Sequence, residues 1–274
     1  MMEADLKFIS LSSGSSGNCY YISSGSRAIL IDVGVGSRAI KKKLLEYDLT
    51  LDSIEAILVT HDHFDHIRNV GTFAQRHCKP VYTTRRIHKA MDHHYCTQGR
   101  LKGLVKYLDE EVENDIDGIK VTPFEVPHDA TQTVGYHIVF EGHNITVVTD
   151  VGAVTDRVVE FARKADHLII ESNYDLDMLL TGNYTKELKE RIMNGHGHIS
   201  NEQNSHLLRL AAHEGLQDIY LCHLSGNNNT PERAYAQAKK TLEAIGSRAS
   251  LSCLPRSAAS ELFIWHKPHC GSRG

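Results

Sequence analysis

The sequence predicts an α/β fold, and two observations favour this class. Short apolar runs of strand length alternate with amphipathic helical patterns along the 274 residues. The side chains of greatest chemical interest lie at or just beyond the carboxyl ends of predicted strands, where loops gather residues from distant parts of a chain. We expect a single domain over residues 1–268 and a loose tail over 269–274.

The composition is that of an ordinary soluble protein. Hydrophobic residues make up 41% and charged residues 23%, and the net charge is -4 with no long run of one sign. The charge therefore gives no reason to expect a basic face for nucleic acid. The six cysteines show no CxxC spacing, and no apolar stretch is long enough to cross a bilayer. These features predict a cytoplasmic protein with reduced thiols.

The first predicted strands flank a turn rich in Gly and Ser. Residues 6–11 alternate apolar and polar, residues 12–18 form the turn, and 19–22 form the return strand. The turn has two open interpretations. It is either a plain hairpin, or its small side chains and free N–H groups cradle a phosphate. The candidate substrate-binding residues in it are Ser15, Ser16 and Asn18.

A buried strand over residues 28–32 and a helix follow. Ser37 is expected to cap the helix, which runs to about Tyr47. Asp32 ends the strand, and a carboxylate in that place more often fixes a loop or a ligand histidine than binds a metal. We therefore expect Asp32 to orient a histidine.

The motif His-Asp-His-Phe-Asp-His at residues 61–66 directly follows the apolar run 56–60. Side chains two apart in an extended segment point the same way, so His61 and His63 can converge on one ion. A helical pattern begins at Asp65, which places Asp65 and His66 within reach of a second ion. A solvated, His-rich loop is the weaker interpretation, because a helix N-terminus does not favour three histidines. Imidazole and carboxylate ligands suit zinc, manganese or iron, and two such ions form a hydrolytic site.

The chain after the motif is less informative. Residues 80–83 form a short strand, and 86–95 form a helix. Residues 97–117 are polar and acidic, and they are either a lid over the site or, as we favour, a surface connection.

Later strands each end in a residue that can do chemistry. The predicted strands and these residues are 120–126 with His128, 144–149 with Asp150, 166–170 with Glu171, and 218–222 with His223. Taken alone, His128 would more often be structural, and Glu171 a capping or salt-bridging carboxylate. A further strand covers 134–140, helices cover 155–164, 201–211 and 230–244, and closing strands cover 249–253 and 262–265.

Two further loops are candidates for binding. His196 and His198 are alternatives for one role in the loop before the helix at Asn201. A polar turn precedes the strong helix start Thr230-Pro231-Glu232, and such a place suits an anion. The candidate substrate-binding residues in this turn are Ser225, Asn227, Asn228 and Asn229.

The H-x-H-x-D-H motif after an apolar strand resembles the signature of the metallo-β-lactamase superfamily. Four other segments, at 11–18, 171–173, 197–201 and 223–232, make the chain similar to the YycJ/WalJ branch, which is described as DNA exonucleases. The similarity runs from about Phe8 to about Leu254.

This resemblance implies a four-layer αββα sandwich with two divalent ions, zinc or manganese before iron, at one edge of the sheets. The implied ligands of the first ion are His61, His63 and His128; those of the second are Asp65, His66 and His223, with Asp150 bridging. It favours the substrate role for the Gly/Ser turn, and it selects His198 over His196. His198 would then protonate the leaving oxygen, and Glu171 would orient it.

Three classes of function follow. The favoured one is a phosphodiesterase acting on DNA, a 5′-to-3′ exonuclease in which a metal-activated hydroxide attacks phosphorus, with Asp65, Glu171 and His198 as catalytic residues. The second is a small-molecule hydrolase of a cyclic phosphodiester or a thioester. The third is a di-iron redox protein or an inactive scaffold; His63 speaks against the redox form, whose relatives carry Glu there. The expected partner is DNA, with its strandedness and the oligomeric state left open, and no membrane.

Overall fold

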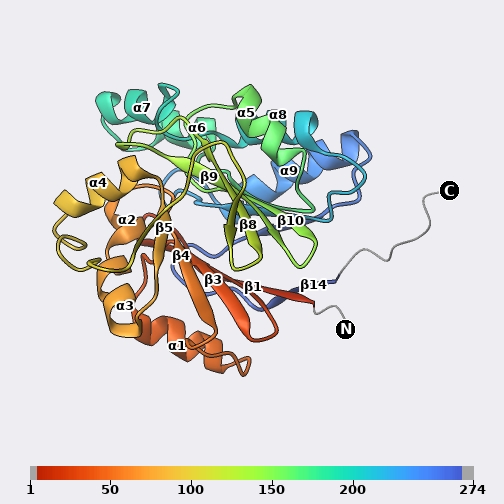
Figure 1. Ribbon diagram of the computed structural model, residues 1–274. Coiled ribbons are helices and arrows are strands. Elements are labelled where there is room, and N and C mark those ends of the chain that lie inside the picture. Colours follow the sequence, from red (N-terminus) through yellow and green to blue (C-terminus); the bar gives the residue numbers. More distant parts are fainter. Residues whose placement is uncertain (1–4, 267–274) are drawn as a thin grey trace.

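The computed structural model describes residues 5–266, so the predicted tail at 269–274 lies outside the described residues. Two mixed sheets of seven strands each pack face to face, and helices cover their outer faces (Figure 1). The strand orders are β14-β1-β2-β3-β4-β5-β6 and β13-β12-β11-β10-β9-β8-β7. This is the α/β fold that the sequence predicts, in the four-layer arrangement that the resemblance implies. Between residues 5 and 266, no helix is long and apolar enough to cross a membrane.

The first sheet is built mainly from the amino-terminal part of the chain. Its strands are β1 Leu6–Gly14, β2 Gly17–Ser24, β3 Arg27–Ile31, β4 Ile54–Leu58, β5 Val81–Thr83, β6 Val105–Tyr107 and β14 Phe263–Trp265. Its helices are α1 Ser37–Leu45, α2 Phe64–Ile67, α3 Val70–His77 and α4 Arg85–His93. β2 and most of β3 and β4 are buried on both faces, which explains why they read as continuous apolar runs.

The second sheet brings the later strand ends together. Its strands are β7 Asn114–Ile116, β8 Ile119–Glu125, β9 Val134–Phe140, β10 His143–Val148, β11 His167–Glu171, β12 Asp218–Cys222 and β13 Ser250–Cys253. Its helices are α5 Asp156–Ala162, α6 Leu176–Thr181, α7 Lys186–Met193, α8 Asn201–Ala211 and α9 Pro231–Ala244. β10 to β13 are parallel, so their carboxyl ends share one edge of the sheet.

Large aromatic side chains fill the space between the sheets. Phe8 of the first sheet packs against Tyr220 of the second, with ring centroids 5.0 Å apart, and Trp265 donates a hydrogen bond to the Tyr220 hydroxyl at 2.8 Å. The indole N–H is thereby satisfied in the core, which a buried Trp requires. This packing holds the two sheets, and hence the loops at their shared edge, in a fixed relation.

The structure corrects three local predictions. Gly36, not Ser37, is the N-cap of α1, and the Ser37 hydroxyl hydrogen-bonds His77 instead. The helical pattern after the metal motif breaks into two helices, α2 and α3. The β1–β2 turn is shorter than the predicted 12–18, because both strands extend until only Ser15 and Ser16 join them. Residues 97–117 carry β6 and β7, one edge strand of each sheet, which the sequence did not predict.

Candidate metal centre and active site

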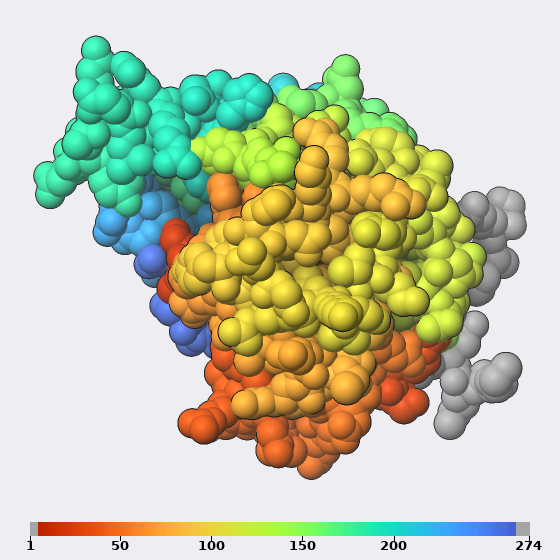
Figure 2. Space-filling view, turned by 60° about the vertical axis from the view of Figure 1, so that its left-hand side comes forward, coloured from red at the N-terminus to blue at the C-terminus, as the bar shows by residue number. Residues whose placement is uncertain are grey.

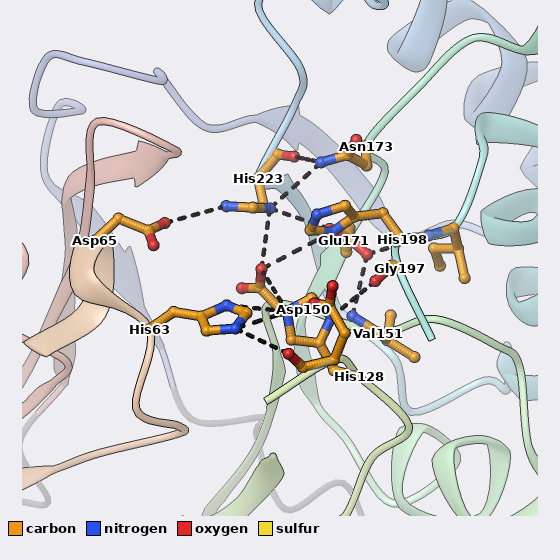
Figure 3. A network of polar contacts seen from close by, with 12 residues as sticks. His63, Asp65, His128, Asp150, Val151, Glu171, Asn173, Gly197, His198 and His223 are labelled. Atoms are coloured by element: carbon orange, nitrogen blue, oxygen red, sulfur yellow. Dashed lines mark hydrogen bonds and ion pairs between the residues drawn. The ribbon is translucent and has the colours of Figure 1, made fainter. Parts of the chain in front are cut away.

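All seven predicted metal ligands lie beyond the carboxyl ends of strands, five of them on loops and Asp65 and His66 in the short helix α2. Four of them follow β4, and the other three follow β8, β10 and β12. Figure 3 shows five of these residues around one centre, together with Glu171 and His198. His223 has a φ of 51°, a left-handed conformation that is uncommon outside Gly, so the chain turns sharply directly after β12.

The predicted ligands form two adjoining clusters. Within each cluster, one ligand atom per residue lies within 4.8 Å of the others. The clusters are His61, His63 and His128, and Asp65, His66 and His223. Asp150 groups with His61 and His66, and also with His223, so it lies between the two clusters. This is the position that a bridging carboxylate would need, and the binding of ions there stays a prediction.

Each histidine of the first cluster uses one ring nitrogen on the protein and turns the other inward. The hydrogen bonds are His61 Nδ1 with Thr60 Oγ1 at 3.0 Å, His63 Nε2 with the Asp129 carbonyl at 3.1 Å, and His128 Nδ1 with the Gly197 carbonyl at 2.7 Å. His63 Nδ1 and His128 Nε2 then face each other at 3.3 Å. Such outer hydrogen bonds fix the ring orientation and the tautomer of metal-binding histidines.

The histidines of the second cluster are oriented in the same way, and the inward Nε2 of His66 also lies 2.9 Å from Asn18 Nδ2. His66 Nδ1 hydrogen-bonds Asp32 Oδ2 at 2.7 Å, and His223 Nδ1 hydrogen-bonds Glu171 Oε1 at 3.1 Å. Their Nε2 atoms lie 3.4 Å and 3.7 Å from Asp65 Oδ2. Asp32 also accepts hydrogen bonds from the backbone and hydroxyl of Thr60. Asp32 therefore has the histidine-orienting contact that its place in the sequence predicts.

The donor set fits divalent cations. Among the described residues, His61 Nε2, His223 Nε2 and Asp150 Oδ2 are buried and make no hydrogen bond, although Asp150 Oδ2 lies 3.2 Å from His66 Nε2. A buried polar atom left unsatisfied costs about 1–3 kcal/mol, so three of them at one point call for a ligand. His61 Nε2 belongs to the first cluster and His223 Nε2 to the second, and Asp150 lies between the two. Imidazole and carboxylate donors in this number suit zinc or manganese.

Opposite charges dominate the electrostatics of the site. Burial alone would raise the pKa of Asp150, but the imidazoles of His223 and His66 outweigh it and hold that pKa well below its usual range. Burial would lower the pKa of His223, but the Asp150 carboxylate, with Asp65 and Glu171, raises it to about 10. Asp150 is therefore ionised at neutral pH in a buried position, where a cation stabilises it.

Glu171 is completely buried, and its carboxylate accepts hydrogen bonds from four groups of the site. Its Oε1 accepts hydrogen bonds from His198 Nδ1 at 2.7 Å and from His223 Nδ1 at 3.1 Å. Its Oε2 accepts from the backbone N–H groups of Val151 and Ile199. With both oxygens occupied, Glu171 positions two histidines.

His198 is suited to proton donation. Burial lowers its pKa, but the adjacent Glu171 carboxylate more than compensates, so the pKa of His198 is raised. Its side chain is 23% exposed and lines the cavity over the clusters. His196 is exposed and is absent from the lining, as the sequence favoured.

A cavity of about 250 Å³ lies over the two clusters. Of the predicted substrate residues, Ser15 and Ser225 line it, whereas Ser16 is exposed in the turn outside it. One side of its wall comes from a segment that the sequence did not single out. These residues are Tyr184, Leu188, Arg191 and Ile192, on and before α7. The only sequence signal was the i, i+4 spacing of Leu188 and Ile192, and it faces the cavity rather than a core.

The predicted asparagines divide into three groups. Asn18 is buried and donates to Asp65 Oδ2 at 2.9 Å, so it contacts a ligand rather than the cavity. Asn227 donates to the Tyr184 hydroxyl at 2.9 Å, at the edge of the wall. Asn228 and Asn229 are buried away from the cavity, and Asn229 hydrogen-bonds the backbone of the 172–173 loop. Asn229 thus braces a loop with its side chain, whereas Asn228 does so through its backbone carbonyl, which accepts a hydrogen bond from the Asp175 N–H at 2.8 Å.

Arg191→Ala is expected to weaken the binding of an anionic substrate. Arg191 pairs with Asp129 at 2.6 Å, and the Asp129 carboxylate lies 3.5 Å from His128 Nε2 at the cavity mouth. Without Arg191, an unpaired carboxylate would face the substrate. We expect KM for a phosphodiester to rise about threefold to tenfold, and more at low salt, because exposed charges are screened. Steady-state kinetics at two ionic strengths, with Lys164→Ala as a control, test this; an unchanged KM at both would contradict it.

Gly34→Ala is expected to disturb the second cluster. A Cβ at Gly34 would collide with the backbone of Asp65 and of Asn18. Because backbone must shift, we expect a loss of about 1–3 kcal/mol in unfolding free energy together with reduced metal content. Thermal unfolding and metal analysis measure both. Gly36→Ala is the matched control, since nothing lies within 4 Å of its Cβ position; equal behaviour of the two variants would refute the close approach.

Comparison with known proteins agrees with this geometry. A family model described as the beta-lactamase superfamily domain matches residues 27–223. A protein named exodeoxyribonuclease WalJ from Streptococcus pneumoniae serotype 2 (strain D39) is 33% identical over 236 residues, 86% of this chain and 87% of that protein. Exodeoxyribonuclease YycJ from Bacillus anthracis is 32% identical over 245 residues, 88% and 90% of the two chains.

The fold is also found among solved structures. The metallo-beta-lactamase fold protein YhfI from Bacillus subtilis superposes with a TM-score of 0.70 at 17% identity, over 95% of this chain and 99% of that one. Sequence, fold and the inward-facing His/Asp clusters therefore agree, and the chain belongs to the metallo-β-lactamase superfamily of hydrolases, in the branch of the WalJ and YycJ proteins.

Proposed function

We propose that the chain is a metal-dependent phosphodiesterase acting on DNA, an exonuclease that digests from the 5′ end. One observation carries this proposal: two ligand clusters meet at Asp150 beneath a cavity that the His198–Glu171 pair borders. The names of the WalJ and YycJ relatives support DNA as the substrate.

The proposed ligands hold two ions. His61, His63 and His128 would hold one, and Asp65, His66 and His223 the other, with Asp150 between them. Two divalent ions at this place would lower the pKa of water and neutralise negative charge on the phosphate. We favour zinc or manganese because of the imidazole-rich donor set.

The remaining chemistry falls to residues of the chain. His198, oriented by Glu171 through Nδ1, turns its other ring nitrogen to the leaving oxygen and gives it a proton. The hydroxyls of Ser15 and Ser225 lie in the cavity wall, where they can donate hydrogen bonds to phosphate oxygens. The wall formed by α7 closes one side of the cavity, which suits the end of a strand better than its middle.

A small-molecule metallohydrolase is the second candidate. The cavity is only about 250 Å³, and Leu188 and Ile192 give it an apolar side. A cyclic phosphodiester or a thioester would fill such a space.

We place the protein in a reducing cytoplasm, as one domain over residues 1–268. The described cysteines are free, and Cys19 and Cys222 are buried. Thiols in such positions are typical of proteins kept reduced.

The deciding experiment compares substrates on the metal-loaded protein. Metal analysis should find about two ions per chain. Single- and double-stranded DNA labelled at the 5′ or 3′ end, RNA and a generic thioester are then offered in parallel. Release of mononucleotides from 5′ ends of DNA is the expected result. Release from 3′ ends would reverse the polarity, and turnover of the thioester alone would establish the second candidate.

A further inference from the structure

Three aromatic rings stack on the surface beside the metal motif. Phe64 and Tyr95 are 5.7 Å apart between ring centroids, and His94 stacks on Tyr95 at 4.7 Å. Phe64 is 45% exposed and Tyr95 is 71% exposed, so much of both apolar rings meets solvent although they stack on each other. The guanidinium of Arg68 lies 5.9 Å from the Phe64 ring. We call Phe64, His94 and Tyr95 the aromatic platform.

A groove joins this platform to the metal motif. Its volume is about 580 Å³, and its lining includes Asp62, Arg86, Lys89 and His94. Asp62 stands between His61 and His63 in the chain, and it accepts a hydrogen bond from the hydroxyl of Thr131, its neighbour in the groove lining. His94 belongs to both the groove and the platform. The groove therefore leads from the loop of the first ligand cluster to the exposed rings.

The groove lining carries two cations, Arg86 and Lys89, against one carboxylate, Asp62, and the chain segment that supplies the cations is basic although the whole chain is acidic. Between residues 76 and 106 the one carboxylate is Asp92. The eight basic residues of the same stretch are Arg76, Lys79, Arg85, Arg86, Lys89, Arg100, Lys102 and Lys106. α3, α4 and the segment that follows form much of the face turned to the viewer in Figure 2. The net charge of -4 conceals this concentration.

We propose that the groove and the aromatic platform bind a single strand of DNA as it runs to or from the active site. Arg86 and Lys89 meet its phosphates, and unpaired bases stack on Tyr95 and Phe64. Exposed aromatic faces beside a basic groove are the physical basis of single-strand binding, whereas the base faces in a duplex are covered by neighbouring pairs. The inference rests on the proposed function for its choice of DNA.

The test measures binding apart from catalysis. A fluorescent single strand of about twelve nucleotides with phosphorothioate linkages, which resist cleavage, is titrated into the metal-loaded protein and followed by anisotropy. Tyr95→Ala should weaken binding about fivefold to a hundredfold, and Tyr95→Phe should restore it, because stacking needs the ring alone. Arg86→Ala with Lys89→Ala should reduce the slope of log Kd against log salt by about 0.7 for each phosphate that is no longer neutralised.

Matched controls and a small substrate separate the outcomes. Tyr235→Ala and Lys239→Ala alter exposed residues of α9 and should bind the strand as the wild type does. Turnover of bis(p-nitrophenyl) phosphate, which is too small to reach the platform, should not change in Tyr95→Ala. Equal loss on this ester would mean that Tyr95 supports the active site, and would overturn the proposal.

Other outcomes of the same titrations would contradict one part of the proposal each. Equal affinity for a blunt duplex would overturn the single-strand assignment, and tighter binding of RNA of the same sequence would overturn the choice of DNA. If the wild type degrades DNA while every groove variant binds normally, the groove proposal fails and the proposed function stands. If the strand binds in the groove but the protein degrades no DNA, the groove proposal stands and the proposed function fails.

Discussion

Asp150→Ala is expected to reduce turnover to background and to disturb both ion sites. The carboxylate lies 3.2 Å from His66 Nε2, 3.4 Å from His223 Nδ1 and 3.7 Å from His128 Nε2, so it contacts both clusters. Its loss removes a shared ligand and leaves the surrounding imidazoles to repel one another when protonated. Metal analysis and turnover on labelled DNA measure the two effects.

The comparison with Asp150→Asn sharpens this result. The amide keeps one oxygen and the volume of the side chain but loses the negative charge. We expect it to retain part of the metal and still to lose most activity, because charge neutralisation of two cations needs the carboxylate. Normal metal content together with a normal rate in Asp150→Ala would refute the bridging assignment.

His198→Ala is expected to lower turnover on DNA by roughly two to four orders of magnitude, the usual worth of a general acid. Both ions should remain bound, because the five other imidazoles and both aspartates are untouched. The loss should shrink on bis(p-nitrophenyl) phosphate, since nitrophenolate departs without a proton. Parallel kinetics on the two substrates measure the difference.

His196→Ala is the control that the chain itself supplies. It removes an exposed imidazole two residues away and should leave both rates unchanged. Loss of an ion in His198→Ala would make His198 a ligand, and equal losses on both substrates would make it a binding residue. Glu171→Gln is a less specific test, because Glu171 also holds His223 and two backbone N–H groups.

Most strands could be predicted because burial on both faces of a sheet leaves a continuous apolar run in the sequence. The predicted bounds of β9 and β12, 134–140 and 218–222, agree with the structure, and the other buried strands differ by one or two residues at an end, except β1, which runs three residues further. The loop ends were predictable for the same reason, since an apolar run that stops at His or Asp marks a strand end. The meeting of His61, Asp150 and His223 in one place depends on tertiary packing, which only the resemblance anticipated.

What escaped prediction has physical reasons too. Helix caps depend on backbone angles, so Ser37 looked like a cap although Gly36 holds that position. Asn229 looked available for an anion, but its side chain satisfies buried carbonyl groups of the neighbouring 172–173 loop. A sequence shows which side chains are polar, but it does not show whether another loop already uses them.

The side of the cavity formed by Tyr184 and α7 can affect substrate specificity without affecting the stability of the fold. No side chain of α7 is buried, and its helix is held at its start by the Thr185 cap and near its end by the Arg191–Asp129 pair. The core would therefore tolerate substitutions there that reshape the cavity, since few of its interactions contribute to folding. The wall of this active site is free to diverge while the metal ligands, fixed by buried strands, are not. New substrates could thus be acquired on this scaffold through α7 at little cost to the fold.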